Sequence, residues 1–289
     1  MDIIEDIKIS FKEGSALTRL IYVNLAVFLF VRLAQILFFL AGKDYLLLNW
    51  LALPEDVNTL FTRPWTIITY MFLHFSFLHI LFNLLGLYWF GKIFLSYFDE
   101  KKLLSLYILG GISGGVMYIL AYNLFPVFRG VNGILMGASA SIIAMLVAVA
   151  AFAPNQPVYL FLIGRIPLKY VAAFWVFLSV LGISTSNAGG NFAHLGGALW
   201  GFFYIRQLGK GKDYGSGIQA FLDKVAALFK PKSKIYVSYK QPPRDDYEYN
   251  RQKNQNQEEI NRILEKISKS GYGSLSKKEK ELLFKIGKK

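Results

Sequence analysis

The side chains able to do chemistry in the apolar part of this chain are few. The 289 residues contain three histidines, His74, His79 and His194, and all three lie in or beside strongly apolar segments. The chain has no cysteine, and no Asp or Glu occurs between Glu100 and Asp213. Ionisable groups in apolar spans are costly and therefore point to function. The missing groups exclude a cysteine nucleophile, thiolate metal sites and, in that stretch, paired carboxylates, so serine, histidine and asparagine remain.

Ser139 is the predicted nucleophile and His194 the predicted base. Ser139 lies in a Gly-Ala-Ser-Ala sequence and His194 in an Ala-His-Leu-Gly-Gly sequence. A serine hydroxyl is a weak nucleophile that needs a base within hydrogen-bond reach, and neutral imidazole, with a pKa of about 6.5, suits that task. Because no carboxylate lies in the later spans, the pattern predicts a Ser-His dyad in place of a Ser-His-Asp triad.

Donors for an oxyanion are present as well. His79 and Asn83 are four residues apart, so they share one face of a helix. An oxyanion that forms in a low-dielectric site is stabilised by preorganised hydrogen-bond donors. We predict that His79 and Asn83 supply two of these donors and that the backbone N–H of Ser139 supplies a third.

Small residues indicate how the helices meet. Gly197 and Gly201 fall near the helix face of the predicted base. Small residues on such a face let another helix approach closely, which would bring a serine hydroxyl within reach of the imidazole. Gly137 and Ser141 belong to a different seam of small residues and are predicted to pack, which leaves Ser139 as the reactive serine.

The composition requires that these residues be positioned by membrane-spanning helices. The chain is 54% hydrophobic and 18% charged, with a mean hydropathy of +0.37, values that do not suit a soluble protein. A spanning helix needs roughly 20 apolar residues. Six spans are predicted, together with an interfacial stretch over 65–76; the spans are residues 20–41, 77–97, 103–124, 134–152, 169–183 and 190–208.

Charge sets the predicted orientation. The net charge of +13 comes mostly from residues 206–289, which hold 20 Lys and Arg against 10 Asp and Glu. This concentration of positive charge in the C-terminal tail therefore bears on which side of the membrane the tail occupies and does not indicate nucleic-acid binding. The remaining Lys and Arg favour the segments that are inside when both termini are cytoplasmic. In that orientation His79, Asn83, Ser139 and His194 all fall within the outer third to half of the membrane.

The chain divides into four predicted segments. Residues 1–19 form a cytosolic N-terminal segment, 20–208 the six-span core, 209–254 a basic cytosolic linker and 255–289 a helical hairpin. A short amphipathic helix is predicted near 217–229, inside the linker. The hairpin's second helix begins with a capping box, in which a serine is followed three residues later by a glutamate. Its lysines suit anionic headgroups, and a tail that only enforces topology is the alternative.

At these residues the chain resembles the rhomboid family of intramembrane serine proteases. The resemblance covers roughly residues 60–208 and consists of several motifs in the expected order. The motifs are Pro64-Trp65-Thr66 to Phe72-Leu73-His74, the His79-x-x-x-Asn83 pair, Tyr107-Ile108-Leu109-Gly110-Gly111, the Gly-x-Ser at Ser139 and the Ala-His-x-x-Gly-x-x-x-Gly from Ala193 to Gly201. The C-terminal hairpin resembles an extension found on rhomboids of Bacteroidetes-type bacteria.

The resemblance implies an all-α, six-span membrane protein that hydrolyses peptide bonds of membrane-spanning substrates near the outer face. It implies Ser139 and His194 as catalytic residues and His79 and Asn83 at the oxyanion site, with no cofactor and no metal. The partners would be transmembrane protein substrates and the lipid bilayer, and the location a bacterial cytoplasmic membrane. The loop over 184–190 would be a mobile cap, and the fifth span a lateral gate.

Two residues depart from the family's pattern, and two other functions stay open. Ala140 stands where the family often has glycine, and Ile143 stands where an aromatic residue often packs near the histidine, which puts in question how His194 is held. One alternative is a proteolytically silent rhomboid-like chaperone or adaptor. The other is a zinc protein with three histidine ligands, which would leave Ser139 without a role.

Overall fold

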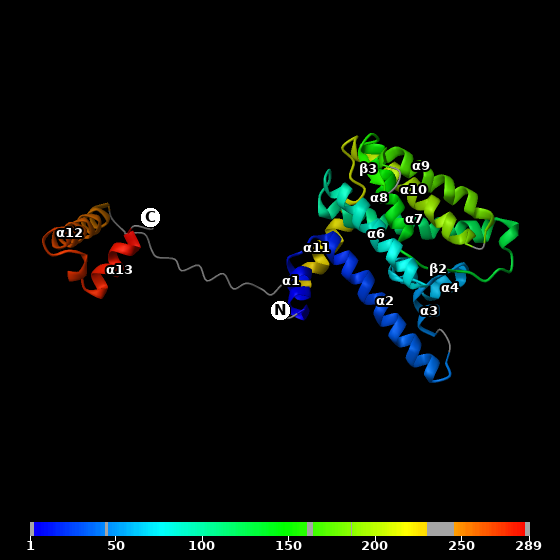
Figure 1. Cartoon of the computed structure of the whole chain (residues 1–289), viewed down its shortest axis with the longest axis horizontal. Coiled ribbons are helices and arrows are strands. Elements are labelled where there is room, and N and C mark those ends of the chain that lie inside the picture. The colour runs from blue at the N-terminus through cyan, green and yellow to red at the C-terminus, as the bar shows by residue number, and fades with distance from the viewer. Residues whose placement is uncertain (1–2, 44–45, 161–163, 186, 230–245, 287–289) are drawn as a thin grey trace. The chain divides into compact units, whose positions relative to one another are not determined.

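The computed structural model describes residues 3–43, 46–160, 164–185, 187–229 and 246–286 (Figure 1). The chain forms two compact units, Met1–Lys230 and Pro231–Lys289. The first unit contains all of the predicted site residues, and each unit is considered by itself.

The first unit is a bundle of long apolar helices, so the predicted all-α polytopic class is confirmed. By length and composition, α2, α6 and α7 can each cross a membrane, whereas α8 and α9 are shorter apolar helices. Figure 1 shows α7, α8, α9 and α10 gathered together and α2 extending beyond them. The helices are α2 (Ala16–Leu40), α6 (Phe77–Leu95), α7 (Glu100–Leu124), α8 (Ser139–Phe152), α9 (Leu168–Leu181) and α10 (Ala188–Leu208).

Short elements connect the helices. Helix α1 precedes α2, and a short strand pair, β3 with β4, lies between α8 and α9. These elements are α1 (Ile3–Glu13), α3 (Leu46–Leu51), β1 (Leu53–Pro54), α4 (Val57–Thr62), α5 (Thr66–Thr69), η1 (Tyr70–Phe72), η2 (Pro126–Phe128), β2 (Ile134–Leu135), β3 (Pro157–Leu160), β4 (Gly164–Pro167) and η3 (Gly182–Ser184).

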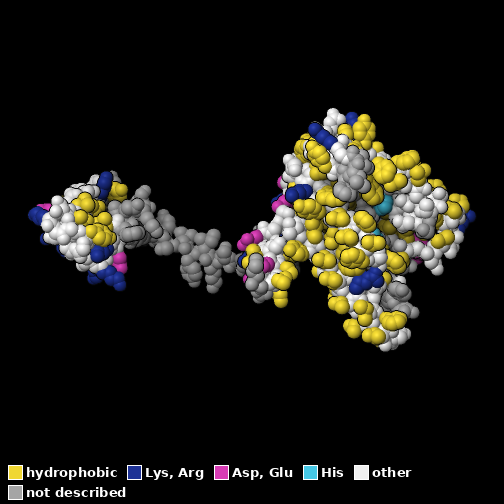
Figure 2. Space-filling view, viewed as in Figure 1, with side chains coloured by type: hydrophobic (Ala, Val, Ile, Leu, Met, Phe, Trp, Pro, Cys, Tyr) yellow, Lys and Arg dark blue, Asp and Glu magenta, His cyan; other side chains and the backbone are white. Residues whose placement is uncertain are grey.

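The outer surface of this unit is apolar, as a lipid-facing surface must be. Figure 2 shows hydrophobic side chains spread over the helices, with only scattered charged groups among them. On α2, for example, Phe30, Leu37 and Phe39 are 65%, 68% and 73% exposed. Contiguous exposed apolar area of this extent is rare on soluble proteins and is normal for helices in contact with lipid.

Helix α6 begins at the predicted residue because Ser76 caps it. The Ser76 side chain accepts a hydrogen bond from the His79 N–H at 3.2 Å, which satisfies one of the first N–H groups of the helix. The stretch before Ser76 forms α5 and η1, two short helical turns, and does not extend α6. The split of the long apolar run at Ser76 is thus confirmed.

The fourth span differs from the prediction, which placed a helix from Ile134. Ile134 and Leu135 form strand β2, which pairs antiparallel with β1, and α8 begins only at Ser139. The reason is local: Gly137 has a φ of +128°, which interrupts any helix, and its N–H donates to the Tyr70 carbonyl at 2.9 Å. Ser139 therefore lies at the N-terminus of the helix and not six residues inside it.

Helix α8 occupies the centre of the bundle. Ten of its 14 residues are buried, and many are small. It packs against α6, α7, α9 and α10. A helix that is apolar all round is expected in such a central position.

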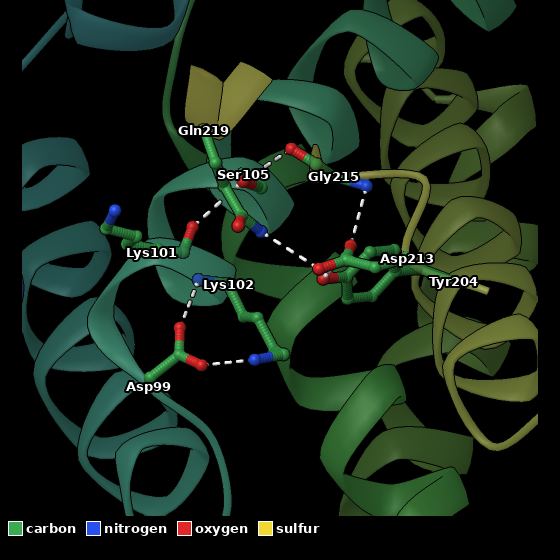
Figure 3. A network of polar contacts seen from close by, with 8 residues as sticks. All are labelled: Asp99, Lys101, Lys102, Ser105, Tyr204, Asp213, Gly215 and Gln219. Carbon is green, nitrogen blue, oxygen red and sulfur yellow. Dashed lines mark hydrogen bonds and ion pairs between the residues drawn. The ribbon is translucent and has the colours of Figure 1, made fainter. Parts of the chain in front are cut away.

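The predicted amphipathic helix near 217–229 is confirmed as α11 (Ser216–Phe229). Polar contacts hold it against the bundle (Figure 3). Asp213 accepts hydrogen bonds from the Tyr204 hydroxyl at 3.1 Å, the Gly215 N–H at 2.8 Å and the Gln219 side chain at 3.1 Å. Lys101 of α7 also forms an ion pair of 2.7 Å with Asp223 of α11.

The second unit contains a helical hairpin made of α12 (Asp246–Ser270), η4 (Tyr272–Ser274) and α13 (Lys277–Ile286). The predicted capping box is confirmed: Glu279 accepts from the Ser276 N–H at 2.6 Å, and the Ser276 side chain accepts from the Glu279 N–H at 3.4 Å. Helix α12 begins at Asp246, nine residues before the hairpin predicted over 255–289. Its first turns are mostly polar and have no apolar face, which is why periodicity did not indicate them.

Candidate active site

Ser139 and His194 are brought together across 55 residues of chain. The His194 Nε2 atom lies 2.8 Å from the Ser139 Oγ atom, which is hydrogen-bond distance. Ser139 is the first residue of α8 and His194 the seventh of α10, two helices that pack along their lengths. This is the geometry that a base needs to take the proton of a serine nucleophile.

The close approach of α8 and α10 depends on glycine. A β carbon placed on Gly197 would lie 2.1 Å from the Ala140 carbonyl oxygen, and one on Gly201 would lie 2.2 Å from the Ala144 carbonyl oxygen. Real β carbons do not approach other atoms so closely, so only glycine fits at either position. The predicted packing role of Gly197 and Gly201 is consistent with these contacts, and the contacts set the distance between Ser139 and His194.

The start of α8 gives Ser139 an electrostatic setting that the predicted longer helix lacks. The first N–H groups of a helix have no intrahelical acceptor, and the helix dipole places partial positive charge there. The Ser139 N–H belongs to this set because the helix begins at Ser139. A negative oxygen that forms beside Ser139 would therefore meet an oriented backbone donor.

His79 is close to Ser139 and is oriented to donate a hydrogen bond. The Phe75 N–H donates to His79 Nδ1 at 3.3 Å, so in the neutral ring the proton is on Nε2. The Nε2 atom faces Gly137: a β carbon on Gly137 would lie 2.9 Å from Nε2 and 3.8 Å from the Ser139 Oγ atom. Gly137 thus lets the His79 ring lie against the turn that leads into Ser139.

Asn83 lies on the same cavity wall one helical turn further along α6. Its Nδ2 donates to the His79 carbonyl at 2.7 Å, and its buried Oδ1 has no hydrogen-bond partner. The amide group carries two N–H bonds, so one remains for another acceptor. The structure thus brings His79 and Asn83 to the site, with one donor of Asn83 already used within its own helix.

His74 packs beside His79 and not against the dyad. The two ring centroids are 5.1 Å apart with an interplanar angle of 67°, and His74 is buried. Among the residues that the structure describes, no group of three or more His, Cys, Asp or Glu side chains is placed to hold a metal ion. The arrangement gives the three-histidine zinc alternative no support.

A cavity of about 680 Å³ connects these residues. Its polar wall includes His79, Asn83, Ser139, His194 and Asn187. Its apolar wall comes mainly from α6, β2, α8 and α9 and includes Phe75, Leu78, Phe82, Phe90, Ile134, Leu135, Met136, Ile142, Ile143, Leu146 and Trp175. An apolar cavity with a few convergent polar groups is the usual form of a small binding or catalytic site.

The two departures from the family pattern both lie in α8, after Ser139. Ala140 is buried, and its side chain faces Gly114 of α7. Ile143 is also buried and lines the cavity. Among the described residues no aromatic ring pairs with the His194 imidazole, so that ring is held by other groups.

The group that does contact the second imidazole nitrogen is Ser179, which was not among the predicted site residues. The Ser179 Oγ atom lies 3.3 Å from His194 Nδ1 and also donates to the Trp175 carbonyl at 2.9 Å. Ser179 is 2% exposed. In the sequence, Ser179 appears as a lone serine among the apolar residues of α9, and such a serine by itself suggests helix packing.

Comparisons with known proteins agree with this arrangement. Residues 62–211 match the family model of the Rhomboid domain, and residues 245–289 match a model described as a Family of unknown function (DUF6576). RHOMBOID-like protein 12, mitochondrial, of Arabidopsis thaliana is 30% identical over 162 residues, which cover 52% of this chain and 48% of that protein. Presenilin-associated rhomboid-like protein A, mitochondrial, of Danio rerio is 32% identical over 151 residues, which cover 50% of this chain and 37% of that protein.

A bacterial relative is similar to the same extent. Rhomboid protease GlpG of Yersinia enterocolitica is 30% identical over 162 residues, which cover 55% of this chain and 52% of that protein. The chain thus spans about half the length of these curated relatives or less. The residues matched by the Rhomboid domain model, 62–211, include all of the predicted site residues, whereas α2 and the second unit lie outside that match.

Proposed function

The chain belongs to the rhomboid family, and from this premise we propose that it is an intramembrane serine endopeptidase with Ser139 as nucleophile and His194 as base. The observation that carries the proposal is the 2.8 Å contact between His194 Nε2 and Ser139 Oγ inside a cavity among apolar helices. A serine and a histidine at this distance form the minimal unit of nucleophilic acyl transfer.

The reaction would proceed in two steps. In the first, the Ser139 oxygen attacks the substrate carbonyl, and its proton passes to His194 Nε2. The imidazolium then donates that proton to the leaving amine, which departs and leaves an acyl-enzyme. In the second, a water molecule gives a proton to His194 and attacks the ester, and Ser139 recovers its proton as the acid leaves.

The oxyanion of each tetrahedral intermediate would meet three donors. They are the Ser139 N–H at the start of α8, the Nε2–H of His79 and the remaining amide N–H of Asn83. Preorganised donors in a site of low dielectric stabilise developing charge more than they would in water. The tautomer of His79, set by the Phe75 N–H, supports its place in this group.

The substrates would be membrane-spanning proteins cut near the outer face. The site lies among apolar helices, so a chain that reaches it can come directly from the lipid. A stable helix hides its carbonyl groups, so the substrate must unwind around the scissile bond, and helix-destabilising residues such as glycine would favour this. We place the chain in a bacterial cytoplasmic membrane with both termini cytoplasmic. The distribution of Lys and Arg supports this orientation of the termini.

A catalytically silent adaptor is the second candidate. Such a protein would keep the fold and a substrate-sized cavity but would not need an activated serine. The hydrogen bond between Ser139 and His194 favours the protease.

Labelling with a fluorophosphonate tests the proposal without knowledge of the substrate. Wild-type protein in liposomes should become labelled on Ser139, whereas Ser139→Ala should not. Ser141→Ala is the matched control, because Ser141 is buried two residues further along α8 and its hydroxyl has no partner. Equal labelling of the wild type and Ser139→Ala would overturn the assignment, and an unlabelled but folded wild type would favour the adaptor.

A further inference from the structure

The His194 imidazole is held between two serines on two different helices. Ser139 Oγ lies 2.8 Å from Nε2, and Ser179 Oγ lies 3.3 Å from Nδ1. Ser179 is buried on α9, the helix that the family resemblance associates with substrate entry. No role for this serine follows from the proton transfers described above, since those use Nε2 alone.

The direction of the Ser179 hydrogen bonds determines which nitrogen of His194 carries the proton. Ser179 has one O–H bond, and that bond is directed to the Trp175 carbonyl at 2.9 Å. Its oxygen is therefore left as an acceptor toward His194 Nδ1. A neutral imidazole with the proton on Nδ1 has a free lone pair on Nε2, which is the form that can accept the proton of Ser139.

We propose that Ser179 is a positioning residue, whose oxygen accepts a hydrogen bond from His194 Nδ1–H and so holds the imidazole in the tautomer and orientation that Ser139 requires. This proposal rests on the proposed protease function for its kinetic consequence, but the hydrogen bond itself can be observed without a substrate. Ile143 stands where the family often has an aromatic residue, and no ring among the described residues pairs with His194, so Ser179 is the group that can orient the imidazole. It is a neutral counterpart of the aspartate in a triad, and it suits a stretch of chain that contains no acid.

The proposal links the base to the packing of α9. Helix α9 buries only four of its residues, Leu168, Val171, Ala172 and Ser179. Three of these lie in its first two turns, and Ser179 alone lies near the other end, beside His194. Movement of that end of α9 away from α10 would withdraw the acceptor from Nδ1, so the orientation of the base would depend on the position of this helix.

Nitrogen-15 NMR of histidine-labelled protein tests the tautomer directly, since the chain has only three histidines. The His194 signals are assigned by their loss in His194→Gln. In wild type we expect Nδ1 to be protonated and Nε2 to be unprotonated. In Ser179→Ala, which removes the acceptor with little change in shape, we expect a mixture of tautomers.

Kinetics with a reporter that carries a transmembrane segment provide the second readout. Loss of a neutral hydrogen bond should lower kcat about twofold to tenfold in Ser179→Ala and leave KM unchanged. Ser179→Thr keeps the hydroxyl and should restore both kcat and the wild-type tautomer. Ser113→Ala is the matched control, because the Ser113 hydroxyl donates to the Gly196 carbonyl of α10 at 2.9 Å without contact to the imidazole. It should leave kcat and the tautomer unchanged.

The results test the role of Ser179 separately from the protease function. Wild-type kcat and unchanged nitrogen-15 shifts in Ser179→Ala would overturn the proposal, and so would a loss of kcat with no change of tautomer, since that indicates packing alone. Retained cleavage in Ser139→Ala would overturn the protease function instead. In that case a shifted tautomer in Ser179→Ala would still show that Ser179 holds His194.

Discussion

Gly197 of α10 faces the Ala140 carbonyl of α8 so closely that a β carbon on this glycine would lie 2.1 Å from the oxygen. Ala140 directly follows Ser139, the proposed nucleophile, and Gly197 lies three residues after His194, the proposed base. The spacing of the two helices at this point therefore controls the spacing of the reactive groups. It also explains why the base can reach a serine whose helix neighbours are all small or aliphatic.

Replacement of Gly197 should separate the two helices. Gly197→Ala would push α10 from α8, and a displacement of about 1 Å at a catalytic group can cost about 100-fold in rate. We expect kcat to fall at least tenfold, with a lower unfolding temperature because overpacking typically costs about 1–3 kcal/mol. Reporter cleavage and thermal unfolding in detergent measure the two effects.

Gly217→Ala is the matched control for that substitution. Gly217 lies in α11 and has no heavy atom within 4 Å of an added β carbon. Alanine is a better helix former, so this variant should keep full activity and wild-type stability or slightly more. Full activity in Gly197→Ala would show that the helix spacing is not what positions the dyad.

Asn83 should contribute to the rate without being essential. Asn83→Ala removes one of three expected oxyanion donors, and loss of one such donor typically costs about 10-fold to 1,000-fold in kcat. His194→Ala should be as damaging as Ser139→Ala, because both remove the same proton-transfer step. Single-turnover cleavage rates measure these differences.

Asn123→Ala is the control for the asparagine variant. Like Asn83, Asn123 donates to the carbonyl four residues earlier, at 2.8 Å, but it does not line the cavity. It should cleave at the wild-type rate. An identical, complete loss in Asn83→Ala, His194→Ala and Ser139→Ala, with altered thermal unfolding, would point to misfolding and count against the oxyanion role.

Two truncations should behave differently. Removal of residues 231–289 takes away the second unit alone, and reporter cleavage should remain within about twofold of wild type. Removal of everything after Leu208 also deletes Asp213 and leaves the buried Tyr204 hydroxyl without its acceptor, which typically costs about 1–3 kcal/mol of stability. Thermal unfolding should therefore separate the two truncations. If the truncated protein of residues 1–230 is folded but does not cleave the reporter, the second unit takes part in catalysis.

The hairpin should lose stability in acid. The Ser276 N–H and then Lys266 lower the pKa of Glu279 from 4.5 to about 2. A depressed pKa means that the ionised carboxylate stabilises the fold. That contribution is full above about pH 4.5 and disappears as the pH falls toward 2. Hydrogen exchange of α12 and α13 in the whole protein should show less protection for Glu279→Gln than for wild type at pH 6.5. The difference should vanish near pH 2, and equal protection at pH 6.5 would contradict the prediction.

The residues of the candidate site could be selected from their types, whereas its local geometry could not be predicted. Ser139 and His194 stand out because the surrounding chain has no acid, no cysteine and few polar groups, and the glycines after His194 indicate a close helix contact. The start of α8 depends on strand pairing with residues 80 positions earlier and on the φ of Gly137, neither of which an apolar run reveals. Ser179 was missed because a hydrogen bond between helices leaves no periodic pattern in the sequence.

The length of α8 has a consequence for where a substrate would be cut. Its 14 residues extend about 21 Å, against roughly 30 Å of hydrocarbon. The helix ends at Phe152 before a polar turn on the side assigned to the cytoplasm, so Ser139 would lie about 9 Å below the outer boundary. The distance from the inner surface of the membrane to Ser139 would thus be fixed by the length of α8. For each 3 Å by which the bilayer thickens, the scissile bond would move about two residues further into a substrate's helix, so lipid chain length would select the product.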